Sequence, residues 1–195
     1  MNNLILSAFA GVLTAAVSGA PLHVVQASVT IFGDGLSKDC EMGARAASVG
    51  KLLDPQALAA CDQALELESL RLHDLVGTYI NRGVILLSRA QYALAKQDFD
   101  RAVMLMPGIG ETYTDRGAAL IGLGRYAEGI ADIDYGLTLS PSEPEKAYYN
   151  RALADEALDD MKSAYFDYLH ANRLNPKWVE PRNQLARFTV AKAPS

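Results

Sequence analysis

One stretch of this chain occurs three times. Residues 113–141 align with residues 79–107 at a distance of 34 residues, and with residues 148–176 at a distance of 35. Near its start each copy has a polar residue, Arg and a small residue: Asn81-Arg82-Gly83, Asp115-Arg116-Gly117 and Asn150-Arg151-Ala152. Later positions also recur: Ala95, Phe99, Ala102 and Pro107; Gly129, Ile133, Gly136 and Pro141; Ala164, Tyr168, Ala171 and Pro176. A period between roughly 20 and 50 residues predicts a linear array in which each unit packs on its neighbours.

The period and its small, aromatic and proline landmarks are similar to those of the tetratricopeptide repeat (TPR) family. This resemblance implies an all-α fold, a right-handed α-solenoid of helix-turn-helix repeats that ends in a C-terminal capping helix. We expect this TPR domain to cover residues 38–191. Its expected parts are a degenerate repeat at 38–75, three clear repeats at 76–109, 110–144 and 145–178, and a capping helix at 179–191.

The N-terminal 27 residues differ from the rest, because Met1–Ala27 contains no Asp, Glu, Lys or Arg. Its apolar run is short for a transmembrane helix and ends near Val25-Gln26-Ala27, which resembles a signal-peptidase site. We therefore expect 1–27 to be a cleaved signal peptide and the protein to be periplasmic or secreted. A cut after Ser18-Gly19-Ala20 and an uncleaved membrane anchor remain alternatives. Residues 28–37 are expected to form an extended N-terminal lead.

Composition excludes several classes of function. The net charge is −5 and no Lys/Arg-rich run is present, which argues against a nucleic-acid partner. No phosphate-binding glycine loop, Ser-His-Asp set or zinc-protease motif occurs. His73 and His170 fall in separate predicted helices, and no His or Cys cluster could complete a zinc site. We expect neither an enzyme nor a bound cofactor or metal.

The only two cysteines, Cys40 and Cys61, fall on the two helices of the degenerate repeat. In an exported protein such a pair is expected to form a disulfide. Closing a loop of this length would stabilise the fold by about 3 kcal/mol in the chain-entropy model. Two buried thiols are the alternative, because Cys61 occupies the core position that Phe99 takes in the next repeat.

A guanidinium and a carboxylate recur once in every clear repeat. A catalytic pair is needed only once, so this repetition favours an ion-pair ladder between neighbouring helices. We expect Arg116 to pair with Asp132 of its own repeat or with Asp98 of the one before. A basic row that captures an acidic peptide end is the alternative. The predicted ladder contains Arg82, Arg116, Arg151, Asp98, Asp132 and Asp167.

The resemblance also implies a concave groove lined by the first helix of each repeat. The expected groove residues are Ile80, Asn81, Val84, Thr114, Asp115, Ala118, Tyr149, Asn150 and Leu153. Family members that bind peptide carboxylates have lysines on this surface, whereas this chain has none there, and Asp115 would repel a carboxylate. A neutral groove with aliphatic walls is better suited to an extended segment or helix of a partner protein. A self-associating, dimerising module is the alternative function.

The middle repeat has Gly129 and Gly136 where its neighbours have alanine. Because glycine inside a helix costs roughly 0.5–1 kcal/mol relative to alanine, Gly→Ala changes there would be stabilising if space permits. The alternative is that the glycines let two helices approach closely, in which case alanine would overpack the contact.

Overall fold

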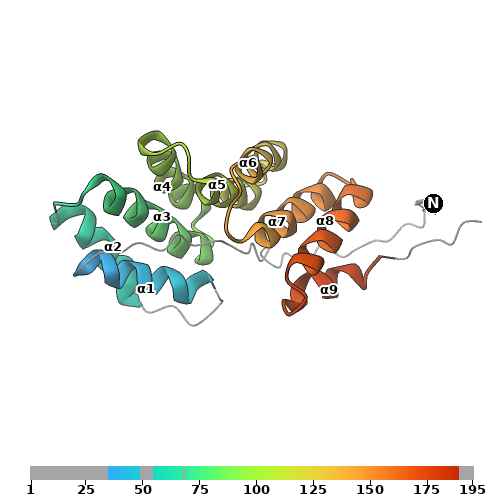
Figure 1. The fold of residues 1–195 in the computed structure, drawn as a ribbon, viewed down its shortest axis with the longest axis horizontal. Coiled ribbons are helices and arrows are strands. Elements are labelled where there is room, and N and C mark those ends of the chain that lie inside the picture. Colours follow the sequence, from blue (N-terminus) through green and yellow to red (C-terminus); the bar gives the residue numbers. More distant parts are fainter. Residues whose placement is uncertain (1–34, 49–54, 68, 189–195) are drawn as a thin grey trace, which may run out of the picture.

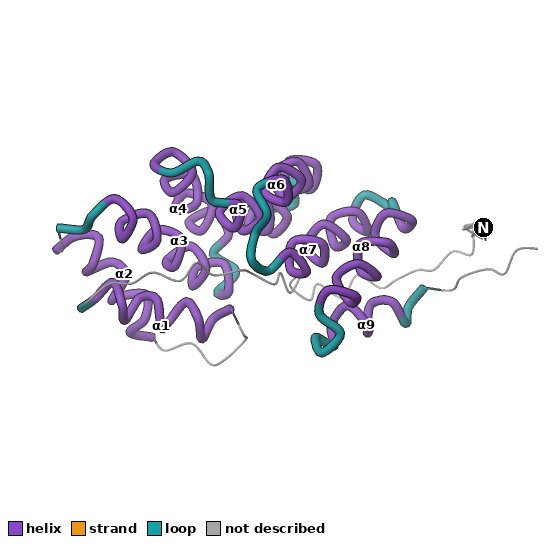
Figure 2. The backbone as a smooth tube through the Cα atoms, in the orientation of Figure 1, coloured by secondary structure: helices purple, strands orange, loops and turns teal. Residues whose placement is uncertain are grey.

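The computed structural model describes residues 35–48, 55–67 and 69–188, and these residues fold into helices joined by short turns (Figures 1 and 2). The predicted signal peptide and residues 28–34 of the predicted lead lie outside the described residues. Within the described ranges there are nine helices: α1 Leu36–Ser48, α2 Pro55–Leu67, α3 Leu72–Ser88, α4 Tyr92–Leu105, α5 Gly110–Gly122, α6 Tyr126–Thr138, α7 Pro144–Ala157, α8 Met161–Leu174 and α9 Val179–Leu185. The predicted all-α fold is confirmed.

The helices pack in consecutive pairs. α1 packs on α2, α3 on α4, α5 on α6 and α7 on α8, and α9 packs against α8. The first helix of each pair also contacts the first helix of the next pair, so that α1, α3, α5 and α7 form one continuous layer. The pairs follow one another along the long axis of the molecule (Figure 1). This is the arrangement of a solenoid, in which each unit is stabilised mainly by its immediate neighbours.

Small residues allow the paired helices to approach, and one large side chain fills the space between them. In the second pair this side chain is Phe99, which lies against Gly83, because a β-carbon added at Gly83 would be 2.6 Å from the Phe99 ring. Ile133 and Tyr168 take the same position in the next two pairs, and all three are fully buried. The aromatic or aliphatic landmark of the sequence repeat is therefore the central core residue of each pair.

Both ends of the domain differ from the predicted boundaries. Helix α1 begins at Leu36, so Leu36 and Ser37 are helical and not part of an extended lead. Helix α9 ends at Leu185, whereas the capping helix was expected to continue to residue 191. Beyond Leu185 the chain turns, with the amides of Arg187 and Phe188 donating to the carbonyls of Gln184 and Leu185. This tight i→i+3 pattern is a common way for a helix to end.

Among the described residues, no helix has both the length and the apolar character that crossing a bilayer would require.

Candidate functional site: the inter-repeat ladder and the inner helix face

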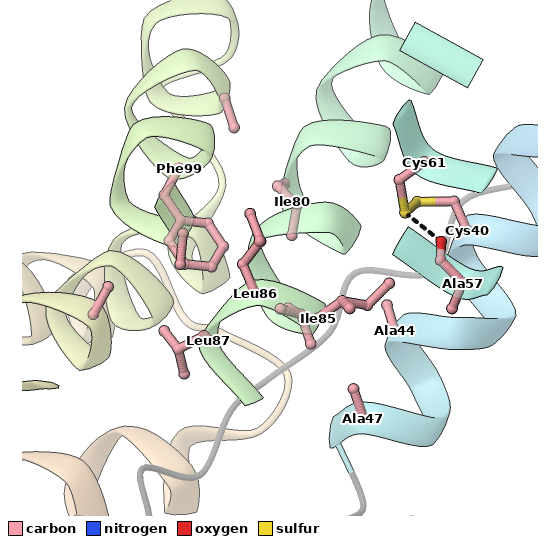
Figure 3. Close-up of a cluster of buried hydrophobic side chains, with 14 of the residues drawn as sticks. Cys40, Ala44, Ala47, Ala57, Cys61, Ile80, Ile85, Leu86, Leu87 and Phe99 are labelled. Atoms are coloured by element: carbon pink, nitrogen blue, oxygen red, sulfur yellow. Dashed lines mark hydrogen bonds between the residues drawn. A yellow bond between two sulfur atoms is a disulfide. The ribbon is translucent and has the colours of Figure 1, made fainter. Parts of the chain in front are cut away.

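A disulfide joins the two helices of the first pair. Cys40 of α1 and Cys61 of α2 are fully buried and bonded, with their Cα atoms 4.7 Å apart. Figure 3 shows the bond at the edge of the cluster that contains Ala44, Ala57 and Ile85. Cys61 occupies the position that Phe99 fills in the next pair. A covalent bond thus replaces the large core side chain in the least regular repeat.

The repeated arginines each bind the repeated aspartate of their own helix pair with two parallel hydrogen bonds. Arg116 of α5 donates from Nε and Nη2 to Asp132 of α6 at 2.6 and 2.9 Å. Arg82 binds Asp98 in the same way, with both distances 2.7 Å. Arg151 binds Asp167 at 2.7 and 2.8 Å. This two-point geometry is the strongest form of a guanidinium–carboxylate contact.

The third nitrogen of each arginine reaches back to the preceding helix pair. Arg116 Nη1 donates to Asp100 of α4 at 3.2 Å, and not to Asp98, which is occupied by Arg82. Arg82 Nη1 donates to Asp62 of α2 at 2.8 Å, and Arg151 Nη1 donates to Asp134 of α6. The prediction that Arg116 contacts Asp98 of the preceding repeat is therefore wrong, because the contact is with Asp100, two residues further along α4. Each arginine links three helices of two successive repeats.

A tyrosine one turn before each arginine completes the contact. The guanidinium carbon of Arg116 lies 5.2 Å from the centre of the Tyr113 ring, and Arg151 lies 5.2 Å from Tyr148. A cation held against an aromatic face gains about 0.5–1 kcal/mol at a partly exposed site. The hydrogen bonds that Arg116 donates to Asp132 also raise the pKa of Arg116, so this guanidinium stays charged at any physiological pH.

The ladder stops after the third clear repeat. Asp100 and Asp134 lie two residues after the paired aspartates Asp98 and Asp132, but the residue two positions after Asp167 is Leu169. No carboxylate at this position of α8 is available to a following arginine. The sequence repeat could have identified all three of these carboxylates, because Asp62, Asp100 and Asp134 directly follow the aligned core residues Cys61, Phe99 and Ile133.

The nine predicted groove residues all lie on the first-helix layer, and all nine are buried. Helix α3 carries Ile80, Asn81 and Val84; α5 carries Thr114, Asp115 and Ala118; α7 carries Tyr149, Asn150 and Leu153. Ile80, Val84 and Ala118 belong to the same hydrophobic cluster as the disulfide. The structure brings these residues together on neighbouring helices.

Asn81 is the most unusual member of this set. Its side chain is 0% exposed, and neither Nδ2 nor Oδ1 has a hydrogen-bond partner in the described part of the chain. Leaving a buried polar group unpaired costs about 1–3 kcal/mol. A side-chain amide offers one acceptor and two donors, which matches the N–H and C=O of an extended peptide backbone.

Tyr149 does not line an open groove, because the C-terminal helix covers it. Its ring centre lies 4.9 Å from that of Trp178 and 5.5 Å from that of Tyr168, and its hydroxyl accepts a hydrogen bond from Gln184 of α9 at 3.4 Å. Tyr149 is only 3% exposed. The prediction that Tyr149 is available to a partner is therefore wrong, because α9 covers it.

Asp155 of α7 is a buried carboxylate at a position where the other repeats have leucine. Leu120 precedes it by one repeat period and Leu86 by two, and both are buried. Burial, together with the nearby carboxylate of Asp167, raises the pKa of Asp155 to about 6. Arg151 opposes this rise, but its guanidinium is already bound to Asp134 and Asp167.

No group of three or more His, Cys, Asp or Glu side chains is arranged to hold a metal ion in the described part of the chain. The acidic side chains of the ladder are bound to arginines. The two faces of interest are therefore the charged ladder, which holds the repeats together, and the inner face of α3, α5 and α7, where an unpaired amide is buried.

Comparisons with known proteins identify the repeat. Residues 145–177 match the model of the tetratricopeptide repeat. The first TPR domain of human RPAP3 is 23% identical over 58% of this chain and 88% of that chain, with a TM-score of 0.54. The same domain of Spaghetti (RPAP3), solved with the HSP90 peptide SRMEEVD, is 23% identical over 58% and 89%, with a TM-score of 0.53. MamA from Desulfovibrio magneticus RS-1 is 19% identical over 80% and 84%, with a TM-score of 0.57. At these identities the structural likeness establishes the fold. Comparison with curated proteins gives no match.

Proposed function

We propose that this chain, which is a TPR repeat protein, is an exported bacterial protein that binds a partner protein or peptide in the periplasm. TPR domains are protein–protein interaction modules, and the further statements on location and site are our proposal. The uncharged segment 1–27 supports export, as does the Cys40–Cys61 disulfide, since such bonds persist in oxidising compartments.

We place the binding site on the inner face of α3 and α5. The observation that carries this choice is Asn81, whose buried amide lacks a partner. An extended segment of a partner would supply backbone N–H and C=O groups to it. The Spaghetti (RPAP3) domain, which has this fold, was solved with a bound peptide. The carboxylate of Asp115 disfavours a partner that inserts its C-terminal carboxylate.

Export is tested by intact mass. The protein isolated from the periplasm should begin at Ser28 and be two mass units lighter than the fully reduced chain, because the disulfide removes two hydrogens. A chain that begins at Met1 and is recovered from the cytosol would refute export.

Partner binding is tested by photo-crosslinking in the cell envelope followed by mass spectrometry, with two variants compared. Asn81→Leu removes the amide of the proposed site, whereas Asn172→Leu changes a partly buried asparagine on α8. We expect crosslinking of the partner to fall at least tenfold for Asn81→Leu and to be retained for Asn172→Leu. Equal crosslinking by both variants would reject the inner face. Dimers in light scattering, with no other protein crosslinked, would favour the self-associating module.

A further inference from the structure

We propose that the turn between α7 and α8 binds a lysine or arginine side chain of a partner protein, with Asp155, Asp159 and Asp160 as the carboxylates that receive its charge. This site goes beyond the proposed function, because it lies at the end of α7 and not on the inner face of α3 and α5. Each of the two sites can therefore be tested without the other.

The turn after α7 is acidic, whereas the two equivalent turns are not. Residues 155–160 read Asp-Glu-Ala-Leu-Asp-Asp. One and two repeat periods earlier, residues 120–125 read Leu-Ile-Gly-Leu-Gly-Arg and residues 86–91 read Leu-Leu-Ser-Arg-Ala-Gln. In all three stretches the amide of the last residue donates to the carbonyl of the first at 2.9 Å. The shape of the turn therefore does not require the acidic residues.

These acidic residues gather at the end of a helix where negative charge is least favourable. The last carbonyls of a helix carry partial negative charge, so a cation is stabilised beside them and a carboxylate is not. Glu156 is compensated by Arg187 at 3.2 Å. Asp160 accepts hydrogen bonds from the amide and the hydroxyl of Ser163 at 3.1 and 2.8 Å, which lower the pKa of Asp160 and keep it ionised. Asp159 is exposed and adds its charge to the same turn. This end of α7 therefore attracts a basic side chain.

Asp155 is a buried carboxylate without a cation of its own. It is only 9% exposed, and its side chain makes no hydrogen bond or salt bridge within the described part of the chain. Arg151, one helical turn before it, is bound to Asp134 and Asp167. Buried charges in proteins are normally paired, and a purely structural role at this position is filled by leucine in the other two repeats. A cation from a partner would supply the charge that Asp155 lacks.

Two exposed apolar side chains extend the fit to a long basic side chain. Leu158 and Met161 flank Asp159 and Asp160 in the turn, and they are 51% and 44% exposed. Lysine and arginine carry their charge at the end of a methylene stem, which packs on apolar surface while the charged head stays among polar groups. A bare metal ion would gain nothing from these apolar side chains. The turn therefore suits the side chain of a basic protein segment.

Binding at this turn should depend on pH through Asp155. Burial raises the pKa of Asp155 to about 6, and the charges of Asp167 and Asp160 on α8 and of Asp134 on α6 add to this rise, while Arg151 on α7 opposes it. At pH 7 the carboxylate is mostly ionised and attracts a cation, whereas at pH 5 it is mostly protonated and neutral. A basic ligand should therefore bind more tightly at the higher pH.

The test is an NMR titration of the purified full chain with the peptide acetyl-Gly-Lys-Gly-Lys-Gly-amide, and with the same peptide carrying norleucine in place of both lysines. We expect the lysine peptide to shift the amide signals of residues 155–162 and the norleucine peptide to leave them unchanged. Asp155→Leu and Asp159→Asn should each raise the Kd of the lysine peptide about fivefold or more. Asp39→Asn, which removes an exposed carboxylate from α1, should bind as wild type does.

The pH dependence separates Asp155 from the other carboxylates of the turn. Between pH 7 and pH 5 the Kd of the wild type should rise about threefold or more, and Asp155→Leu should lose most of this rise. Asp159→Asn tests the site even if Asp155→Leu perturbs the fold, because the φ of 64° at this position suits asparagine. Binding by either variant at the wild-type Kd would overturn the proposal, as would a wild type that does not bind the lysine peptide. Equal weakening by Asp39→Asn would also overturn it, because the attraction would then come from the net charge of the chain.

Discussion

Gly117 of α5 and Gly129 of α6 face each other across the middle helix pair, each with its missing side chain directed at the other's carbonyl. A β-carbon added at Gly129 would lie 2.8 Å from the carbonyl oxygen of Gly117, and one added at Gly117 would lie 2.7 Å from that of Gly129. Gly110 and Gly136 repeat this relationship seven residues away, at 2.9 and 2.8 Å. The middle repeat therefore joins its two helices at backbone distance.

This geometry decides between the two expectations for Gly129 and Gly136. Gly129→Ala and Gly136→Ala should each lower the free energy of unfolding by about 1–2 kcal/mol, because overpacking against backbone exceeds the gain in helix propensity. Gly108→Ala is the matched control, since nothing lies within 4 Å of its added β-carbon. Denaturant melts measure all three. A stabilised Gly129→Ala would show that the two helices can separate at little cost.

The ladder predicts unequal coupling of Arg116 with its two aspartates. In double-mutant cycles with Arg116→Met, Asp132→Asn should couple by about 1.5–3 kcal/mol, because this contact has two hydrogen bonds and both side chains are 19% exposed. Asp100→Asn should couple by about 0.2–1 kcal/mol, because Asp100 is 41% exposed. Asp98→Asn should show no coupling with Arg116. Equal coupling of Asp100 and Asp132 would contradict the structure.

Asp155 predicts a dependence of stability on pH. Its pKa is raised to about 6 in the folded protein, against an ordinary value of about 3.9 for the unfolded chain. Between these values the folded state holds more protons than the unfolded state, so the free energy of unfolding falls as the pH rises from 4 to 6. Above pH 6 the ionised carboxylate is a standing penalty. We expect this penalty to lower the free energy of unfolding by about 1–2 kcal/mol above pH 6, after allowing for partial exposure of the carboxylate to solvent.

Asp155→Leu restores the residue of the other two repeats and should remove this penalty. At pH 7 the variant should be about 1–2 kcal/mol more stable than wild type, and the difference should shrink toward pH 4. Thermal melts across this range measure it. The control is Asp159→Asn, an exposed position with a φ of 64° that asparagine tolerates. A difference that is constant with pH would mean that Asp155 does not titrate in this window.

The burial of Tyr149 under α9 predicts a structural role for this side chain. Tyr149→Ala should lower the free energy of unfolding by about 3 kcal/mol, because it leaves a cavity between Trp178 and Tyr168. Trp178 is the only tryptophan, so its fluorescence reports the docking of α9 directly and should shift to the red. Phe166→Ala, at a position that is 46% exposed, serves as the control. An unchanged emission spectrum would contradict the contact.

The sequence period was sufficient to predict the helix pairs, and it indicated Asp132 as one of two alternative partners for Arg116. Arg116 and Asp132 pair as expected because both belong to one repeat, whose internal geometry the family pattern determines. The contact of Arg116 with Asp100 depends on how one repeat sits on the next, and a shift of half a helical turn exchanges Asp98 for Asp100. Periodicity within one unit carries little information about that shift.

The nine predicted groove residues lie on α3, α5 and α7, and their burial was not foreseen. A repeat pattern indicates which side of a helix points toward the concave surface, and says nothing of other segments that lie there. Tyr149 illustrates this, since it is covered by a short helix outside the repeats. Asp155 could have been found from the sequence alone, because a carboxylate replaces leucine at a repeated position.

The arginine ladder makes the repeats interchangeable as units of gene duplication. Every clear repeat carries one arginine that needs a carboxylate in the preceding unit, and the first two of them supply one to the unit that follows, at Asp100 and Asp134. Duplication of the middle unit would give each copy a neighbour with the matching group, and its deletion would let Arg151 meet Asp100. An array built in this way can gain or lose whole units while each arginine still has a carboxylate in the preceding unit. At the C-terminal side Leu169 stands in place of this carboxylate, so a unit added after α8 would lack the arginine contact that joins the others.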